Sequence, residues 1–271
     1  MDRTDVVILV NSTPKYYYIL NFFFGMLRRY APKLKWDIVL ATEDVNNTVC
    51  KLVEDRHGVI LLELPVESSG FLDSRMKALE MLKATDKYKY CLPLQDDFIL
   101  ERYIDEAKIN DLFKYFEEDS SLVSARLMPC PGPSSQIEEY PFWALISSKD
   151  TYKFVFQATL WKLDACLEWY TVICDVLEQN APKNSLTSTE AYRFSIELKN
   201  NIAENSVGQS YFKNWTIKMN YKHIAWIRRG SWSNAVYLSP FPYRPTAIVR
   251  GRLEVWALEL AKREGFFLEG N

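Results

Sequence analysis

Two adjacent acids, Asp96 and Asp97, end a strand-like apolar run in the stretch YKYCLPLQDDFIL, residues 88–100. Neighbouring carboxylates repel one another, and burying either without a partner costs free energy. A divalent cation would neutralise both, and hard oxygen ligands suit Mg²⁺ or Mn²⁺, which commonly bind substrate phosphates. A pair that caps a turn and the following helix is the alternative at this point.

Polar side chains also follow two other predicted strands. Asn11 and Thr13 come after the first strand, and Glu43 comes after the second. In open α/β sheets the ligand binds beyond the carboxyl ends of the strands. We therefore expect these residues and the two aspartates to converge on one crevice.

Strand and helix signals alternate in the first half of the chain. The continuous apolar run at 6–12 is rich in β-branched residues, which predicts a strand covered on both faces. Further strands are predicted at 36–44, 58–65 and 88–98, and helices at 14–30 and 74–86. This rhythm predicts an α/β fold with a mostly parallel central sheet and helices on both faces.

The second half has a less regular pattern. It predicts a helix at 103–119, a strand at 121–129, a loop at 130–136, a helix from about Leu163, a helix at 187–204, short strands within 215–226 and a final helix at 251–263. We find no internal repeat or low-complexity linker, so we expect one continuous domain over residues 1–271.

Composition restricts the class of partner. The chain has 271 residues, 48% hydrophobic and 25% charged, which is an ordinary globular balance. Its net charge of −2 lacks the basic excess that is typical of proteins that bind nucleic acid. Aromatic residues make up 14%, and such rings often line pockets for sugar-like ligands.

The sequence predicts a cytoplasmic protein without a transmembrane segment. Its start, MDRTDVVILVNST, lacks the basic residues and the cleavage site of a signal peptide. The most hydrophobic stretch, 16–27, is shorter than the ~20 residues that span a bilayer, and it predicts a buried helix. Peripheral contact with a membrane surface stays open as an alternative.

Four segments in order resemble the GT-A fold glycosyltransferases, which use a nucleotide-sugar donor and a divalent metal. SRMKALEML precedes YCLPLQDDF, and VFQATLWK (155–162) and FSIELKNN (194–201) are similar to later segments of small bacterial and viral members. The resemblance covers roughly residues 5–230. It implies a GT-A-like, Rossmann-like fold in which 1–125 bind the nucleotide sugar and 126–271 bind the acceptor and carry the catalytic base.

The resemblance also implies a metal site. Gln95 stands where the first acid of the family's D-x-D motif would be, which leaves Asp97 as the direct ligand of Mn²⁺ or Mg²⁺. Asp96 is a second ligand or a partner of the donor's ribose or sugar. His223 is a candidate further ligand, with a structural histidine as the alternative.

Donor binding is expected from six residues. Arg75 would reach the acids or the diphosphate, unless it is a surface residue of its helix. Gln157 and Trp161 are candidates for the sugar site, and Trp161 has plain core packing as its alternative. The contacts expected for base and ribose are Asn11, Thr13 and Glu43.

A general base is expected from Glu197 or Glu190. These residues are seven apart, so they share one face of a helix. Glu197 is preferred because it lies in the segment similar to the family's acidic stretch. A base on the far side of the sugar from the diphosphate would invert the anomeric configuration.

The resulting prediction is a metal-dependent glycosyltransferase that uses a UDP-, GDP- or dTDP-sugar and a glycan or glycoconjugate acceptor. A non-catalytic carbohydrate-binding protein and a sugar-phosphate nucleotidyltransferase are the alternatives. The loop NSTPKYY after the first strand lacks the glycines expected to hold a triphosphate, which disfavours the nucleotidyltransferase. No P-loop motif or G-x-G-x-x-G motif is present.

Overall fold

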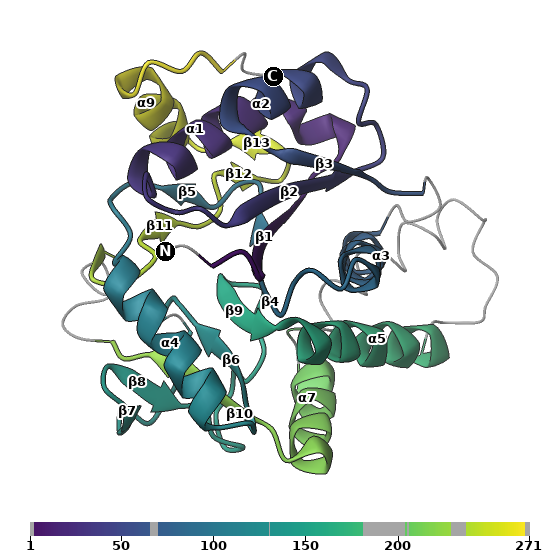
Figure 1. Ribbon diagram of the computed structural model, residues 1–271, viewed down its shortest axis with the longest axis vertical. Helices are drawn as coiled ribbons and strands as arrows, with labels where there is room; N and C mark the ends of the chain where they lie inside the picture. The colour runs from purple at the N-terminus through teal and green to yellow at the C-terminus, as the bar shows by residue number, and fades with distance from the viewer. Residues whose placement is uncertain are drawn as a thin grey trace.

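Helices lie on both faces of a central sheet (Figure 1). The computed structural model describes residues 3–65, 70–129, 131–180, 204, 206–228 and 237–268. The predicted fold class, an α/β protein with a mostly parallel sheet covered on both faces, is confirmed.

Nine strands of the described residues form the central sheet. In spatial order they are β3 (Ile60–Glu63), β2 (Asp37–Thr42), β1 (Val6–Asn11), β4 (Tyr90–Gln95), β9 (Thr159–Lys162), β6 (Leu122–Arg126), β10 (Lys222–Trp226), β8 (Trp143–Leu145) and β7 (Glu138–Tyr140). β9 and β8 pair antiparallel with both of their neighbours, so they run opposite to the other seven strands. The order β3-β2-β1-β4 matches the first four strands of the doubly wound order 3-2-1-4-5-6.

The side chains of β1 explain why its sequence is apolar throughout. Val6, Ile8 and Val10 belong to one core cluster, and Val7 and Leu9 belong to another on the opposite face. Successive side chains of a strand point to opposite faces, so a strand covered on both sides needs apolar residues at every position.

The helices divide between these two clusters. The first cluster includes side chains of α1 (Leu20–Tyr30), α2 (Thr48–His57), α4 (Glu106–Glu118) and α9 (Val255–Arg263). The second includes side chains of α3 (Phe71–Ala84), α5 (Leu163–Asn180) and α7 (Ser206–Met219). The 3₁₀ helix η1 (Pro14–Ile19) precedes α1, and the apolar stretch at 16–27 is a largely buried helical segment, as predicted.

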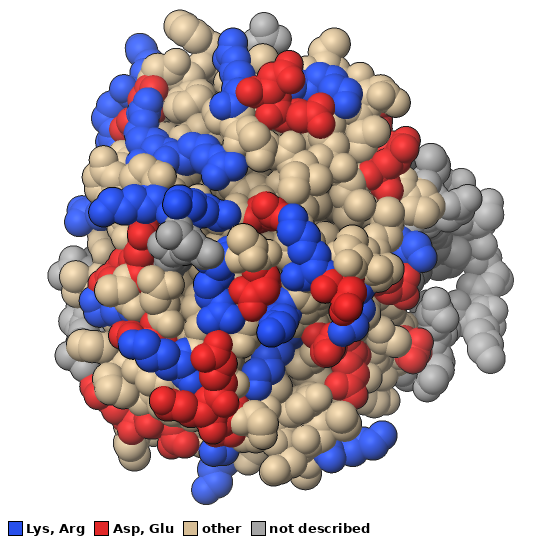
Figure 2. Space-filling model, viewed as in Figure 1, with Lys and Arg blue, Asp and Glu red and all other residues tan. Residues whose placement is uncertain are grey.

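No helix among the described residues combines the length and the apolar character needed to cross a membrane. Acidic and basic side chains are interspersed on the face drawn in Figure 2. This mixture agrees with a net charge of −2.

Several predicted boundaries were wrong. Residues 215–219 belong to helix α7 instead of a strand, because Phe212 and Trp215 share a helical face that packs into the second cluster. The final helix begins at Val255, since Arg252 and Leu253 form a short strand. The sequence pattern also missed α2, β7 and β8, while the predicted helix at 187–204 lies outside the described residues except for Glu204.

The C-terminal segment folds back over the first half of the chain. β11 (Tyr243–Arg244) pairs with β5 (Ile99–Leu100), and β12 (Ile248–Val249) pairs with β13 (Arg252–Leu253). Beyond α9, Phe266 packs against Phe22 with ring centroids 5.3 Å apart. A Cβ atom at Gly25 would lie 2.3 Å from the Phe266 ring. The ring can approach α1 because Gly25 has no side chain.

We expect Phe266→Ala to lower the free energy of unfolding by about 1–3 kcal/mol, because it removes a ring packed on α1. Phe267 is 99% exposed, and Phe267→Ala should change the same quantity by no more than ~0.5 kcal/mol. Urea unfolding of both variants measures this difference. Equal effects would show that the last residues do not dock on α1 in solution.

Candidate functional site

The carboxyl ends of β1, β2 and β4 lie side by side. Asn11, the last residue of β1, is in register with Ala41 of β2 and with Gln95 of β4. The residues that follow these strands therefore emerge at one edge of the sheet. Ser12 and Asp96 meet there, and the Ser12 hydroxyl donates to Asp96 Oδ2 at 2.5 Å.

Asp97 is buried against the C-terminal segment. The N–H of Ala247 donates to the Asp97 carbonyl at 3.2 Å, and the N–H of Ile248 donates to Asp97 Oδ2 over a long 3.4 Å. Asp97 Oδ1 is buried and has no hydrogen-bond partner among the described residues. One carboxylate oxygen is thus unused by the protein groups around it.

Burial makes both carboxyl groups harder to ionise. Loss of water raises the pKa of Asp96 to about 7, the Ser12 hydroxyl opposes this shift, and the neighbouring Asp97 charge adds to it. Burial raises the pKa of Asp97 to about 6, against the effect of the Ile248 N–H. These shifts are expected of paired acids that no described cation neutralises.

Other buried polar atoms near this edge lack partners too. Among the described residues, neither the nitrogen nor the oxygen of the Asn11 side-chain amide is hydrogen-bonded, and the same holds for Glu43 Oε2 and Arg75 Nε. A buried polar atom without a partner costs about 1–3 kcal/mol. A polar ligand that satisfied several of them would recover part of that cost.

Two tyrosines that the sequence did not single out complete the edge. The Tyr17 hydroxyl shares a 2.5 Å hydrogen bond with Thr42 Oγ1 and donates to the Asp44 carbonyl, which fixes the end of β2. Burial raises the pKa of Tyr18, and Tyr16, Asp96 and Asp97 raise it further. The run YYY at 16–18, two residues after Pro14, was the only available sequence signal.

Thr13 lies at the start of η1. Its carbonyl accepts the Tyr16 N–H at 2.8 Å, and its side chain makes no cap hydrogen bond to the helix. The residue is partly exposed. Its hydroxyl therefore remains available at the rim of the edge.

Arg75 and Gln157 lie on a neighbouring cavity. Arg75 in α3 is 2% exposed and donates from Nη2 to the Leu94 carbonyl of β4 at 2.8 Å. It is therefore a buried residue, not a surface one. Gln157 Oε1 accepts the Tyr243 hydroxyl at 2.6 Å.

Trp161 is part of the second core cluster. It is 4% exposed and lies edge-to-face against Phe212 and His223, with only part of it reaching the cavity. The core packing given as the alternative for Trp161 describes most of this side chain, and its role at a sugar site stays a prediction.

The structure also corrects the role predicted for His223. This residue is 2% exposed, and its ring nitrogens are hydrogen-bonded to the hydroxyls of Ser124 at 2.7 Å and Thr216 at 3.1 Å. Burial lowers its pKa to about 3, and the charge of Arg126 contributes. With both nitrogens engaged, His223 is a structural core residue instead of a metal ligand.

The predicted catalytic bases, Glu190 and Glu197, lie outside the described residues. Lys222 of β10 pairs with Asp119 at 3.0 Å. In the described ranges, no three His, Cys, Asp or Glu side chains are grouped so that they could hold a metal ion. Any cation at this edge would therefore depend on the Asp96–Asp97 pair and on ligand oxygens.

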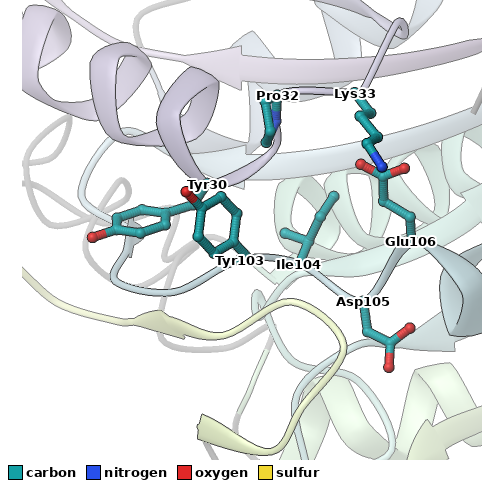
Figure 3. A pocket seen from close by; sticks show the side chains of 7 residues that line it. All are labelled: Tyr30, Pro32, Lys33, Tyr103, Ile104, Asp105 and Glu106. Carbon is teal, nitrogen blue, oxygen red and sulfur yellow. The ribbon is translucent and has the colours of Figure 1, made fainter.

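A larger hollow of ≈ 600 Å³ lies between the end of α1 and the start of α4 (Figure 3). Tyr30 and Tyr103 meet there edge-to-face with centroids 5.4 Å apart, and the Lys33 side chain points toward Glu106. None of the residues predicted to bind a ligand lines this hollow. It is a feature separate from the acidic edge.

No family model matches the sequence, and no curated protein matches it. Among solved structures, the chain is similar to residues 1–349 of TarS from S. aureus, with a TM-score of 0.41 and 12% identity over 84% of this chain and 59% of that one. It is similar to a cytidylyltransferase from Leptospira borgpetersenii, with a TM-score of 0.45 and 13% identity over 97% and 96% of the two chains. The chain is also similar to a second TarS structure, with a TM-score of 0.43 and 13% identity over 79% of this chain and 42% of that one. These distant likenesses concern the fold and carry no conclusion about substrate or reaction.

We expect Asp97→Asn to stabilise the ligand-free protein at pH 8. A carboxyl group whose folded pKa is raised to about 6 stabilises the fold below its ordinary value of 3.8, and this contribution is lost as pH rises through 6. Replacing the buried charge should therefore add about 1–2 kcal/mol at pH 8 and little at pH 4. Thermal unfolding across this pH range measures the difference.

Asp150→Asn is the matched control. Asp150 is also buried, but the N–H groups of Ser134 and Ser147 outweigh the effect of burial and lower its pKa. This variant should lose stability at pH 8. If Asp97→Asn also lost stability there, the Asp97 carboxylate would be well compensated in the free protein.

Proposed function

We propose that this protein is a metal-dependent glycosyltransferase that moves a sugar from a UDP-, GDP- or dTDP-sugar to a hydroxyl of a glycan or glycoconjugate in the cytoplasm. The main support is the Asp96–Asp97 pair at the carboxyl edge of the sheet, where Asp97 Oδ1 is buried without a partner among the described residues. This is the edge at which open α/β sheets bind nucleotides. The family resemblance of four ordered segments favours a sugar transfer over other nucleotide chemistry.

The residues at this edge fit Mn²⁺ or Mg²⁺. Asp97 Oδ1 and the Asp96 carboxylate are hard oxygen donors, and the raised pKa of each reflects burial without a compensating cation. Two carboxylates leave room in an octahedral shell for waters and phosphate oxygens. When bound, such an ion supplies Lewis-acid stabilisation of the charge on the leaving diphosphate.

The other residues of the edge position the donor. Asn11 offers a buried amide that can both donate and accept, and Glu43 offers a buried acceptor oxygen, so they suit the base and ribose. Thr13 adds a hydroxyl at the rim. Ser12 holds Asp96 through its hydroxyl and so fixes the direction of that carboxylate.

Removal of the acceptor proton is assigned to Glu197, with Glu190 as the second choice. This assignment depends on the sequence resemblance alone. A base on the opposite side of the sugar from the diphosphate would give inversion at the anomeric carbon.

Among UDP-, GDP- and dTDP-sugars, we expect only those with the nucleotide that the protein accepts to raise its Tm. They should do so only when Mn²⁺ or Mg²⁺ is present. Asp97→Asn should abolish this shift, because it removes the negative ligand. Asp55→Asn, which changes an exposed carboxylate on α2, should leave it intact. A thermal-shift screen with and without metal provides the measurement.

The product identifies the reaction. Slow release of a nucleoside diphosphate from the matching nucleotide sugar supports sugar transfer, whereas exchange of pyrophosphate into a nucleoside triphosphate would indicate a nucleotidyltransferase. Metal-dependent binding with neither reaction would leave a carbohydrate-binding protein. If no nucleotide sugar shifts the Tm under any condition, the proposal is wrong.

A further inference from the structure

Arg75 is a buried cation without a carboxylate partner among the described residues. Its side chain is 2% exposed, one Nη2–H donates to the Leu94 carbonyl at 2.8 Å, and Nε has no partner. The guanidinium lies over the Phe71 ring at 5.3 Å. Buried charges in proteins are normally paired, because an unpaired one loses its hydration without replacement. We therefore expect a ligand to supply the negatively charged partner of Arg75.

The guanidinium borders a small cavity. The cavity has a volume of ≈ 10 Å³ and lies between α3, β4 and the segment that leads into β9. Its lining includes Arg75, Gln157 and Tyr170 among rings that include Phe71, Phe156 and Trp161. A cavity of this volume holds about one water-sized group. It can admit a single oxygen of a substituent but no sugar ring.

The amide of Gln157 is oriented by Tyr243. The Tyr243 hydroxyl accepts the Ala158 N–H at 2.9 Å and donates its proton to Gln157 Oε1 at 2.6 Å. Gln157 Oε1 accepts this bond with one of its two lone pairs, and Nε2 carries two N–H groups that can donate. Tyr243 is fully buried, and its ring stacks on Phe98 at 4.6 Å, which holds the hydroxyl in place.

We propose that this cavity binds a carboxylate oxygen of the sugar, and that the donor is therefore a nucleotide derivative of a sugar acid. Arg75 Nε and Gln157 Nε2 both donate, and the site carries a positive charge, so it matches an anionic acceptor of hydrogen bonds. A neutral hydroxyl would accept a hydrogen bond but would bring no negative charge to the guanidinium, which forms no ion pair among the described residues. That the carboxylate belongs to a nucleotide sugar rests on the proposed function. That the cavity binds a carboxylate does not.

The experiment compares acidic and neutral ligands that are otherwise alike. With Mn²⁺ present, titration calorimetry would measure UDP-glucuronate against UDP-glucose, and GDP-mannuronate against GDP-mannose. Free D-glucuronate and D-glucose at equal concentration form a second comparison that needs no nucleotide. We expect the acidic member to bind about 10-fold tighter or more within the pair whose nucleotide is accepted, and free D-glucuronate to raise the Tm more than D-glucose does.

Variants of the cavity test the cause. Arg75→Gln should reduce the preference to about twofold or less, while Arg75→Lys, which keeps the charge, should retain part of it. Tyr243→Phe should weaken the preference by releasing the Gln157 amide. Arg28→Gln is the control, because Arg28 donates to the His57 carbonyl on the other face of the sheet and should leave the preference unchanged.

The outcomes separate this inference from the proposed function. Equal binding of acidic and neutral nucleotide sugars, with metal dependence intact, would overturn the carboxylate site and leave the transferase proposal standing. If no nucleotide sugar bound but D-glucuronate were still preferred through Arg75, the transferase proposal would fail and the carboxylate site would stand. Equal behaviour of both free sugars together with equal nucleotide-sugar binding would mean that the cavity holds only a water molecule.

Discussion

The buried acidic edge of the sheet is the constraint on which the rest of the structure depends. Asp96 and Asp97 directly follow β4 and are buried, so their carboxylates are desolvated, and the charge of Asp97 further disfavours that of Asp96. Among the described residues, the Ser12 hydroxyl and the nearby Arg75 charge favour ionised Asp96, and the Ile248 N–H makes a long contact with Asp97. The two core clusters on either face of the sheet must supply the stability that holds this edge together.

The C-terminal segment makes the edge a site, because it encloses the acids from the side that the first half leaves open. β11 pairs with β5 just after the acids, and Ala247 and Ile248 then pass Asp97. Thr246, which lies between β11 and Ala247, has a φ of +66°, a conformation that β-branched residues rarely adopt. Local strain of this kind persists where surrounding structure enforces it, and here it lies beside the acidic pair.

The sequence could predict what depends on neighbouring positions along the chain. Apolar runs located β1, β2 and β4, and the ends of those strands placed Asn11 and the aspartates at one edge. Contacts between distant segments could not be predicted in this way. The Tyr243–Gln157 bond joins residues 86 positions apart, and His223 and Trp161 owe their structural roles to partners from other elements. Polar or aromatic residue types alone do not distinguish a site from a satisfied core.

The charges around β4 also define a direction for any ligand. Asp96 and Asp97 follow the strand end, whereas Arg75 is bound to the Leu94 carbonyl two residues before Asp96. Arg75 is close enough to lower the pKa of Asp96, yet it forms no ion pair with it among the described residues, so the two charges remain separate recognition points. The acids favour a cation and repel a carboxylate, while the guanidinium does the opposite. A ligand with a metal-bound diphosphate at one end and a carboxylate at the other would therefore be held in a single orientation, because the reversed one places like charges together at both points.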